Sequence, residues 1–304
     1  MKKLLKFIAL VTLTMTINNS ILCMNSLHPY FKSILENTYN EQETIIETIF
    51  KAIREHDTKT FRETMKKSSE HGIFKLETKL NNIYYTPLAY ASYLGDFQIV
   101  QDLISMNEKV DQEIFENNTP LLVAVKNGHY KTVECLIKAG ANLDHQNNAG
   151  RTAIMEAAVR VNNKIVVLLL NWGANLNLLD NDGNDVLFFA INKCNVDIVK
   201  LIIDFGGNIN HQNNFGDTCL IAAMQNGSLK TIKFILSLFS DENKIINQAN
   251  KIGNTALMLA TLYNRKEIIS FLRSHGALDT LKNKFNWDVK KFADFSSQIR
   301  LYYS

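Results

Sequence analysis

Two histidines stand in nearly identical surroundings and are the first candidates for chemistry. His145 lies in the stretch LDHQNNAGRTAI, and His211 lies in INHQNNFGDTCL, 66 residues later. A neutral imidazole is a common zinc ligand, and beside a cysteine or a carboxylate it can also transfer protons. The two stretches could instead be one structural segment that occurs twice. The elements around them decide between a shared site and a repeat.

The other motifs give little support for catalysis or metal binding. The segment LLDNDGND around Gly183 has the start of a calcium loop, but Leu178 and Phe189 occupy the first and twelfth ligand positions, where carboxylates are required. The chain contains no phosphate-binding loop, no HExxH, no CxxC pair and no Gly-x-Ser-x-Gly. We therefore predict no catalytic residue, no metal site and no cofactor. A Cys–His nucleophile pair is the enzymatic alternative that the sequence leaves open.

A period of 33 residues organises most of the chain. It is marked by helix-capping anchors, with a four-residue insertion before the last, at Thr86, Thr119, Thr152, Asp185, Thr218 and Thr255. Five residues beyond each anchor is an alanine: Ala91, Ala124, Ala157, Ala190, Ala223 and Ala260. A fixed period of this length is typical of stacked arrays, in which each unit buries its apolar face against its neighbours.

Each unit reads as two short helices followed by a polar hairpin. Threonine is a good N-cap, and Pro87 and Pro120 fall in the first turn, where the missing N–H is tolerated. The recurring alanine allows close approach between helices. The second helix carries aliphatic residues with a helical period and ends near glycines such as Gly140 and Gly173. The segment NLDHQNNAG that follows is rich in turn formers.

These residues resemble the ankyrin repeat family. The resemblance is carried by YYTPLAYASYLGDFQIVQDLI, by NNTPLLVAVKNGHYKTVECLIKAGANLD and by GNTALMLATLYNRKEIISFLRSHGALD. It implies an all-α ankyrin-repeat solenoid of stacked helix-turn-helix units with hairpin loops and divergent helical caps. We predict an N-terminal helical cap with a degenerate repeat at 24–80, six repeats at 81–280 and a capping half-repeat at 281–304. The family's inter-helix glycine is replaced at Val161, Cys194 and Asn264, which predicts tighter or distorted turns there.

The first 23 residues read as a signal peptide. Lys2, Lys3 and Lys6 precede an apolar run that is too short to span a bilayer. Without these lysines the 33 basic residues fall to 30 and match the 30 acidic ones, which argues against nucleic-acid binding. The cleavage site is open between Ser20 and Cys23, and lipidation of Cys23 is an alternative. We predict a mature chain without a stable membrane span, exported to the periplasm or secreted.

The odd number of remaining cysteines predicts free thiols, at Cys135, Cys194 and Cys219. Since His145 and His211 occupy equivalent places two units apart, and stacked units lie about 8–10 Å from their neighbours, the two imidazoles are too distant to share a zinc ion. Repetition is the preferred interpretation of both histidines.

The resemblance also implies a protein-binding groove lined by the hairpin tips and the exposed side of the first helices. The corresponding positions predict a partner site at Tyr85, Tyr93, Leu94, Phe115, Lys126, Asn127, Arg151, Arg160, Asn184, Lys193, Phe215, Gln225, Lys251, Asn254 and Tyr263. The tyrosines should cluster at one end with Leu94 and Phe115, and the middle should be basic, which favours an acidic or amphipathic protein segment.

We therefore expect an exported, monomeric protein that binds another protein and acts on a host. A periplasmic scaffold or protective partner of the bacterial envelope is the alternative, and an enzyme carrying the array as a targeting arm is disfavoured because no room is left for a catalytic domain.

Overall fold

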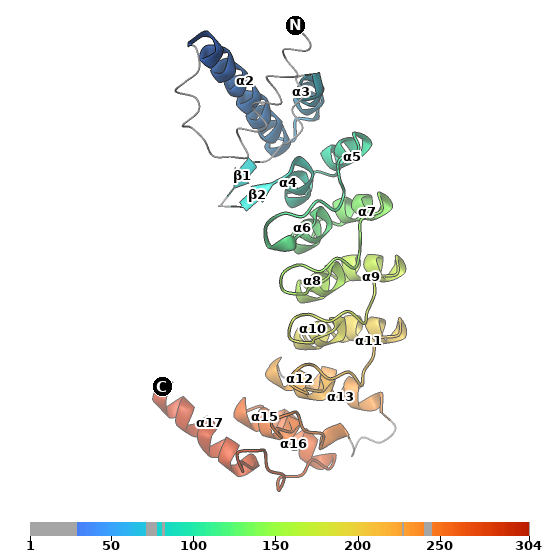
Figure 1. Ribbon diagram of the computed structural model, residues 1–304. Coiled ribbons are helices and arrows are strands. Elements are labelled where there is room, and N and C mark those ends of the chain that lie inside the picture. The colour runs from blue at the N-terminus through green and yellow to red at the C-terminus, as the bar shows by residue number, and fades with distance from the viewer. Residues whose placement is uncertain (1–28, 71–77, 81–82, 227, 240–244, 304) are drawn as a thin grey trace. The chain divides into compact units, whose positions relative to one another are not determined.

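The computed structural model describes residues 29–70, 78–80, 83–226, 228–239 and 245–303 (Figure 1). The predicted signal segment and Gly227 lie outside these residues. The chain divides into two compact units, residues 1–115 and 116–304, within the predicted array. No helix in the described part is long and apolar enough to cross a membrane.

The first unit contains two helix pairs and a short hairpin. Helices α2 (Pro29–Arg54) and α3 (Thr58–Glu70) are followed by the antiparallel strands β1 (Thr78–Leu80) and β2 (Ile83–Tyr85) and by helices α4 (Pro87–Leu94) and α5 (Phe97–Ser105). Helix α2 packs against α3 and α4, and α3 packs against α5. The pair α2–α3 thus stacks on α4–α5 as one repeat stacks on the next.

Charged contacts reinforce this stack at its surface. The side chain of Arg62 donates two hydrogen bonds to the Asp102 carboxylate, at 2.7 and 2.9 Å. His56 Nδ1 lies 2.7 Å from Asp96 Oδ2, and the other Asp96 oxygen caps α5 by accepting from the amides of Gln98 and Ile99. Both pairs join residues 40 positions apart, so they fix the register of one helix pair on the next.

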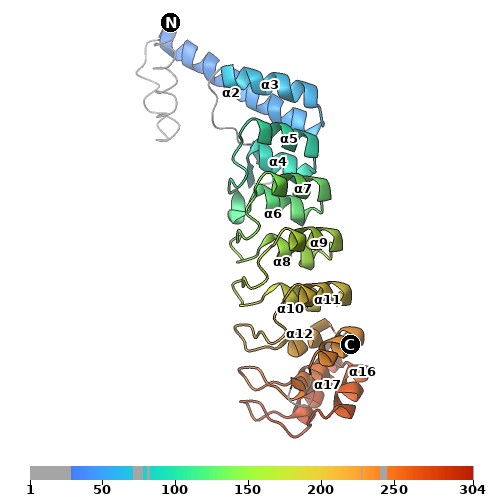
Figure 2. The same cartoon turned by 90° about the vertical axis from the view of Figure 1, so that its right-hand side faces the viewer.

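The second unit is itself a stack, with its helices in two columns. Figures 1 and 2 show the first helices of successive pairs above one another and the second helices beside them. The inner column is α6 (Pro120–Lys126), α8 (Ala153–Val159), α10 (Val186–Asn192), α12 (Cys219–Asn226) and α15 (Ala256–Leu262). The outer column is α7 (Tyr130–Lys138), α9 (Asn163–Asn171), α11 (Val196–Asp204), α13 (Leu229–Ser237) and α16 (Lys266–Ser274). Helix α17 (Val289–Tyr303) packs against α15 and buries Val289 and Phe292.

The anchor residues cap the inner helices as their types predict, with one exception. The hydroxyl of Thr218 accepts from the Ile221 amide at 3.2 Å, and the Asp185 carboxylate accepts from the Phe188 amide at 3.1 Å. The prediction is wrong at Thr152, whose buried hydroxyl has no hydrogen-bond partner in the described structure. Helix α8 therefore begins without a side-chain cap.

The recurring alanine serves both packing and turn formation. Ala157 and Ala190 have no exposed surface. In five of the six repeats the carbonyl group of the recurring alanine accepts a hydrogen bond from the amide at the start of the second helix, as from Asn162 to Ala157 at 3.0 Å. The same bond joins Asp57 to Ala52 at 2.9 Å, so the turn between α2 and α3 is built like the others. A longer side chain at these positions would have no space between adjacent units.

The turns between paired helices keep one conformation whatever residue occupies them. Gly95 and Gly128 have φ values of 78° and 77°, and Val161, Cys194 and Asn264 adopt 57°, 56° and 54°. The expectation of distorted turns is wrong, because helix packing on both sides holds the backbone in the left-handed region. A β-branched residue is strained there.

We predict that Val161→Gly stabilises the protein by about 1 kcal/mol, since relief of strain exceeds the extra entropy of glycine in the unfolded chain. Val161 is 47% exposed, so little packing is lost. Urea denaturation measures the gain. Asn264→Gly is the control and should gain less, because asparagine tolerates this conformation. An equal gain at both positions would refute the assignment of strain to the branched side chain.

The hairpins, here called fingers, are joined to one another by backbone hydrogen bonds. The tip amides of Asn148, Asn181, Asn214, Lys251 and Lys284 donate to the preceding finger at Glu116, Ala149, Asp182, Phe215 and Ile252. The distances between nitrogen and oxygen are 2.9–3.2 Å. Figure 2 shows the fingers side by side along one edge of the helices. The backbone groups of the polar NNAG-type segments thus bond to one another and form a continuous ladder along the fingers.

The four-residue insertion before Thr255 leaves this ladder intact. The Lys251 amide still donates to the Phe215 carbonyl at 2.9 Å, and α12 still packs against α15. Because the finger contact is retained, the extra length is taken up outside the ladder.

Candidate functional site

The two histidines do the same structural task. His145 Nε2 lies 2.8 Å from the carbonyl oxygen of Asn117, and His211 Nε2 lies 2.7 Å from that of Gly183. Both contacts span 28 residues and join a finger to the preceding one. The preferred interpretation as a repeated segment is confirmed.

The described residues give no support for a metal-binding site or a nucleophilic cysteine. They contain no group of three His, Cys, Asp or Glu side chains arranged to hold a metal ion. Cys135, Cys194 and Cys219 are free thiols, as predicted. Burial raises the pKa of Cys135 and raises that of Cys219 well above its usual value, and the nearby Asp185 carboxylate adds to the Cys219 shift. A thiol held protonated in this way is a poor nucleophile.

Asp185 is an acidic group in a position that threonine fills in the other repeats. It is 4% exposed, and burial raises its pKa, although the Phe188 amide and the charge of His211 act in the opposite direction. Its carboxylate caps α10 but is poorly solvated as an anion. We therefore expect this cap to stabilise the helix less at neutral pH than a neutral hydroxyl would.

We predict that Asp185→Thr raises the free energy of unfolding by about 1 kcal/mol at pH 7. The folded-state pKa of Asp185 lies above its unfolded value, so the wild type gains stability as the pH falls through the folded-state pKa. The advantage of the variant should shrink over that range. Denaturation at a series of pH values tests this, and an advantage that grows on acidification would contradict it.

The residue directly before four of the anchors, Asn118, Asn184, Asp217 and Asn254, accepts a side-chain hydrogen bond from the next finger. Asn283 Nδ2 donates to Asn254 Oδ1 at 2.8 Å, and Asn213 Nδ2 donates to Asn184 Oδ1 at 3.0 Å. The structure corrects the expected exposure of Asn254, which is only 8% exposed because the next finger covers it. Asn184 is half-buried for the same reason.

The tyrosines of the first unit also pack internally. The rings of Tyr90 and Tyr93 are stacked with centroids 6.4 Å apart, and Tyr85 lies 5.8 Å from each. The expectation of an exposed Tyr85 is wrong, because it is 7% exposed and burial raises its pKa. Alternate residues of a strand point to opposite faces, so the preceding Tyr84 is outside at 58% exposure. Leu94 is half-buried and Phe115 is 54% exposed.

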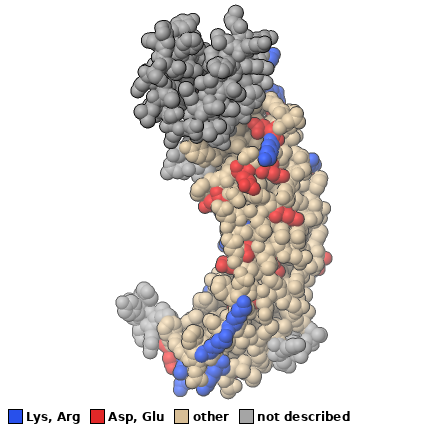
Figure 3. All heavy atoms as spheres, viewed as in Figure 1, with Lys and Arg blue, Asp and Glu red and all other residues tan. Residues whose placement is uncertain are grey.

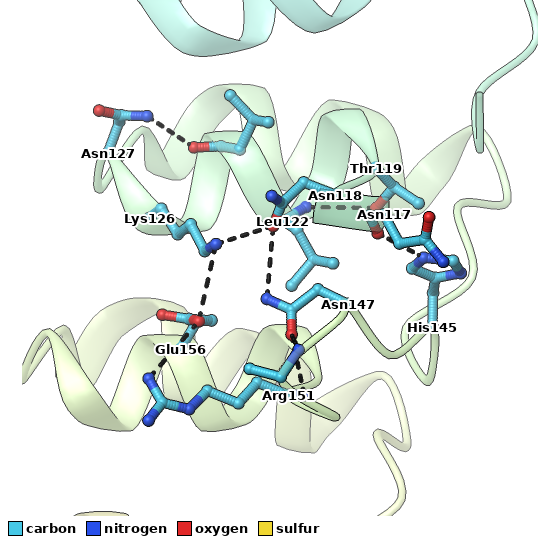
Figure 4. Close-up of polar contacts among 12 residues, drawn as sticks. Asn117, Asn118, Thr119, Leu122, Lys126, Asn127, His145, Asn147, Arg151 and Glu156 are labelled. Atoms are coloured by element: carbon cyan, nitrogen blue, oxygen red, sulfur yellow. Dashed lines mark hydrogen bonds and ion pairs between the residues drawn. The ribbon is translucent and has the colours of Figure 1, made fainter. Parts of the chain in front are cut away.

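A cluster of charged side chains surrounds the buried Glu156 of α8 (Figure 4). Glu156 is 4% exposed, in a slot filled by Val123 and Phe189 in the neighbouring repeats. Its Oε1 is 3.8 Å from Lys126 Nζ and 4.0 Å from Arg151 Nη1. Lys126 also donates to Asn118 Oδ1 at 2.7 Å, and the Arg151 guanidinium lies 5.0 Å from the centre of the Phe189 ring. The buried Glu156 carboxylate thus offsets part of the charge of two cations that were expected to make the middle of the groove basic.

The surplus of positive charge lies further along the chain. Residues 116–226 contain 10 acidic and 8 basic side chains, whereas residues 245–297 contain 4 acidic and 8 basic ones. On the face seen in Figure 3, basic side chains gather toward the end that holds α15 to α17. Electrostatic attraction of an acidic segment is therefore expected to be strongest at the last fingers.

The remaining predicted site residues are exposed on the second unit. Asn127, Arg160, Lys193 and Tyr263 stand at the C-terminal ends of inner helices, Gln225 lies in the last turn of α12, and Phe215 and Lys251 lie at finger tips. Two further tip residues were missed, Ile252 and Phe285, which are 44% and 68% exposed. Each precedes its anchor position by three residues, as Phe215 does, and this spacing could have identified them.

An open cleft with a volume of about 590 Å³ lies between α15, α16 and α17. Its charged lining includes Arg273, which donates to Asp279 at 2.7 Å. The cleft contains no cysteine or histidine among its lining residues.

Comparisons with known proteins agree with this architecture. The family model for ankyrin repeats in three copies matches the overlapping ranges 33–147, 88–180, 121–213 and 187–283. No curated protein sequence matches the chain.

Solved structures match over most of their length. The ankyrin repeat domain of Bcl-3, a member of the IκB protein family, is 25% identical with a TM-score of 0.59, covering 69% of this chain and 97% of that one. The human ASB11 ankyrin repeat domain is 19% identical with a TM-score of 0.61, covering 71% and 98%. A chain in the structure of a predatory endopeptidase from Bdellovibrio bacteriovorus in complex with an immunity protein is 32% identical with a TM-score of 0.53, covering 59% and 92%.

The family model spans well over half of the residues, and its matches coincide with the stacked helix pairs and laddered fingers. The chain belongs to the ankyrin repeat family.

Proposed function

We propose that this protein is an exported binding protein that holds a segment of another protein against its finger tips and inner helices. Ankyrin repeats are protein-interaction modules, and nothing in the described residues points to catalysis. The observation that carries the proposal is the finger ladder. Its backbone groups are satisfied internally, so the half-exposed side chains projecting from it are available for contact with a partner.

Export is proposed from the lysine-led apolar run at the N-terminus. Expression in a bacterial host, followed by fractionation and mass measurement of the mature chain, tests it. Processed protein in the medium or periplasm is expected. Unprocessed protein confined to the cytoplasm would contradict export, and retention of all processed protein in the periplasm would contradict a host-directed role.

The partner can be recovered with the immobilised full-length chain from envelope and host extracts. Captured proteins are retested against an Arg160→Glu, Lys193→Glu variant, because both side chains are exposed at the C-terminal ends of inner helices. We expect a loss of binding of at least about tenfold, the size of one lost charge-assisted contact. Equal capture by the variant and the wild type would refute a role for this surface. Light scattering tests the proposed monomeric state.

The likeness to a chain of the endopeptidase–immunity protein complex favours a second candidate, a protective partner within the envelope. In that role the protein would bind an enzyme and block its activity. If the captured partner is an enzyme, its activity should fall in stoichiometric proportion to added protein. Full activity of the complex would exclude the protective role while leaving binding intact.

A further inference from the structure

Three exposed apolar side chains form a continuous line at the tips of the last fingers. Phe215, Ile252 and Phe285 are 56%, 44% and 68% exposed, and we call them the tip ridge. The Lys251 amide donates to the Phe215 carbonyl at 2.9 Å, and the Lys284 amide donates to the Ile252 carbonyl at 2.9 Å. The three tips are therefore bonded directly to one another, and the ridge has a fixed spacing.

The ridge is confined to one end of the unit. The same tip position is Ala149 and Asp182 in the two preceding fingers. A tip turn needs no large apolar residue, because its conformation is set by the following residue at positive φ, which is Gly150, Gly183, Gly216, Gly253 or Asn286. The aromatic and aliphatic side chains at the last three tips are thus not required by the turn itself.

Lysines accompany the ridge. Lys251 and Lys284 directly precede Ile252 and Phe285, and both are exposed. Lys251 Nζ donates to the Asn214 carbonyl at 2.7 Å, which holds its charge beside the tips. The surrounding residues 245–297 carry the twofold excess of basic over acidic side chains described above. Apolar anchors beside unbalanced positive charge fit an acidic, amphipathic polypeptide.

The hydrogen bonds of the ladder favour a helical over an extended conformation of that polypeptide. An extended segment gains much of its affinity from main-chain hydrogen bonds to a free strand edge. The carbonyls of Phe215 and Ile252 are already occupied by the next finger, so they cannot serve such an edge. A helix satisfies its own backbone and binds through side chains alone. Stacked units about 8–10 Å apart match seven residues of helix, which rise about 10.5 Å.

We propose that the tip ridge binds an acidic amphipathic helix of a partner protein, with one apolar side chain at roughly every seventh residue on each tip. This proposal rests on the proposed protein-binding function and specifies the partner class for one part of that surface. Lys251 and Lys284 would face the acidic flank of the helix.

The test uses the full chain as bait for a display library of helical peptides. Each peptide has about twenty residues, and its sequence is randomised. Peptides enriched by the wild type should be acidic, with apolar residues about seven apart. Their affinity should fall at least about tenfold with Phe215→Ser, Phe285→Ser and with Lys251→Gln, Lys284→Gln.

The matched control is Phe205→Ser. Phe205 is 47% exposed at the C-terminal end of α11, in a row with Trp172 and Leu238 that lies outside the finger tips. It should leave peptide affinity unchanged, and circular dichroism should show all variants folded. Enriched peptides that bind the tip variants as well as the wild type, or that are basic, would overturn the tip-ridge proposal while keeping protein binding. Failure to enrich any peptide, together with failure to capture any protein, would overturn both.

Discussion

Gly183→Ala is expected to reduce the free energy of unfolding by about 3 kcal/mol, although it adds only a methyl group. Gly183 follows a finger tip with φ of 77°. A Cβ atom there would lie 2.8 Å from the backbone nitrogen of Asn214, in the next finger. The Asn214 amide donates to the Asp182 carbonyl at 2.9 Å, so the neighbour cannot move away without breaking the ladder.

Gly173→Ala separates the two causes of this loss of stability, which are the close contact with the next finger and the left-handed backbone conformation. Gly173 has φ of 81°, but a Cβ atom there would meet nothing within 4 Å. This control should lose only about 1 kcal/mol, the cost of a side chain in the left-handed region. Urea denaturation monitored by circular dichroism gives both values. If the two variants lose equal stability, close contact between fingers contributes nothing and the ladder is looser than the structure indicates.

Removal of both cations around Glu156 should have an effect of similar size. Lys126→Met, Arg151→Met is expected to destabilise the protein by about 3 kcal/mol, because it leaves a buried carboxylate without a counter-charge. The distances of 3.8 and 4.0 Å show that neither cation makes a close hydrogen bond to Glu156. The loss therefore measures the burial of the charge rather than the strength of two bonds.

A third substitution tests this explanation. Glu156→Leu places an aliphatic side chain where Leu259 stands in a later repeat, and it should restore most of the stability of the double variant. In the wild-type background the same change should be neutral or stabilising. Thermal and urea denaturation of all four proteins completes the cycle. A triple variant that is no more stable than the double variant would contradict the uncompensated charge as the cause.

The helix pairs and their cores follow directly from the 33-residue period. The spacing predicted the family, the capping residues and the buried alanines, since each of these depends on contacts within one unit or between equivalent positions of adjacent units. It also predicted that His145 and His211 share one role. Contacts that recur in every repeat can be predicted from the sequence, because once one repeat is assigned the equivalent residues of the others follow.

The site was predicted less well, since exposure depends on what the next unit covers. Asn254 appeared free in sequence, but Asn283 of the following finger donates to it. Tyr85 is buried and Tyr84 is exposed because they point to opposite faces of a three-residue strand, and the sequence pattern did not predict that strand. The charge of Arg151 was expected to face a partner, but Glu156, in a slot normally apolar, balances part of it.

The retention of the finger contact across the four-residue insertion has a practical consequence. The fifth and sixth repeats keep their finger contact although the sequence between their anchors is four residues longer than in the other repeats. This part of the sequence therefore tolerates added length, and it is a suitable place to insert a fluorescent reporter or an affinity tag. Such an insertion would leave the row of finger tips uncovered.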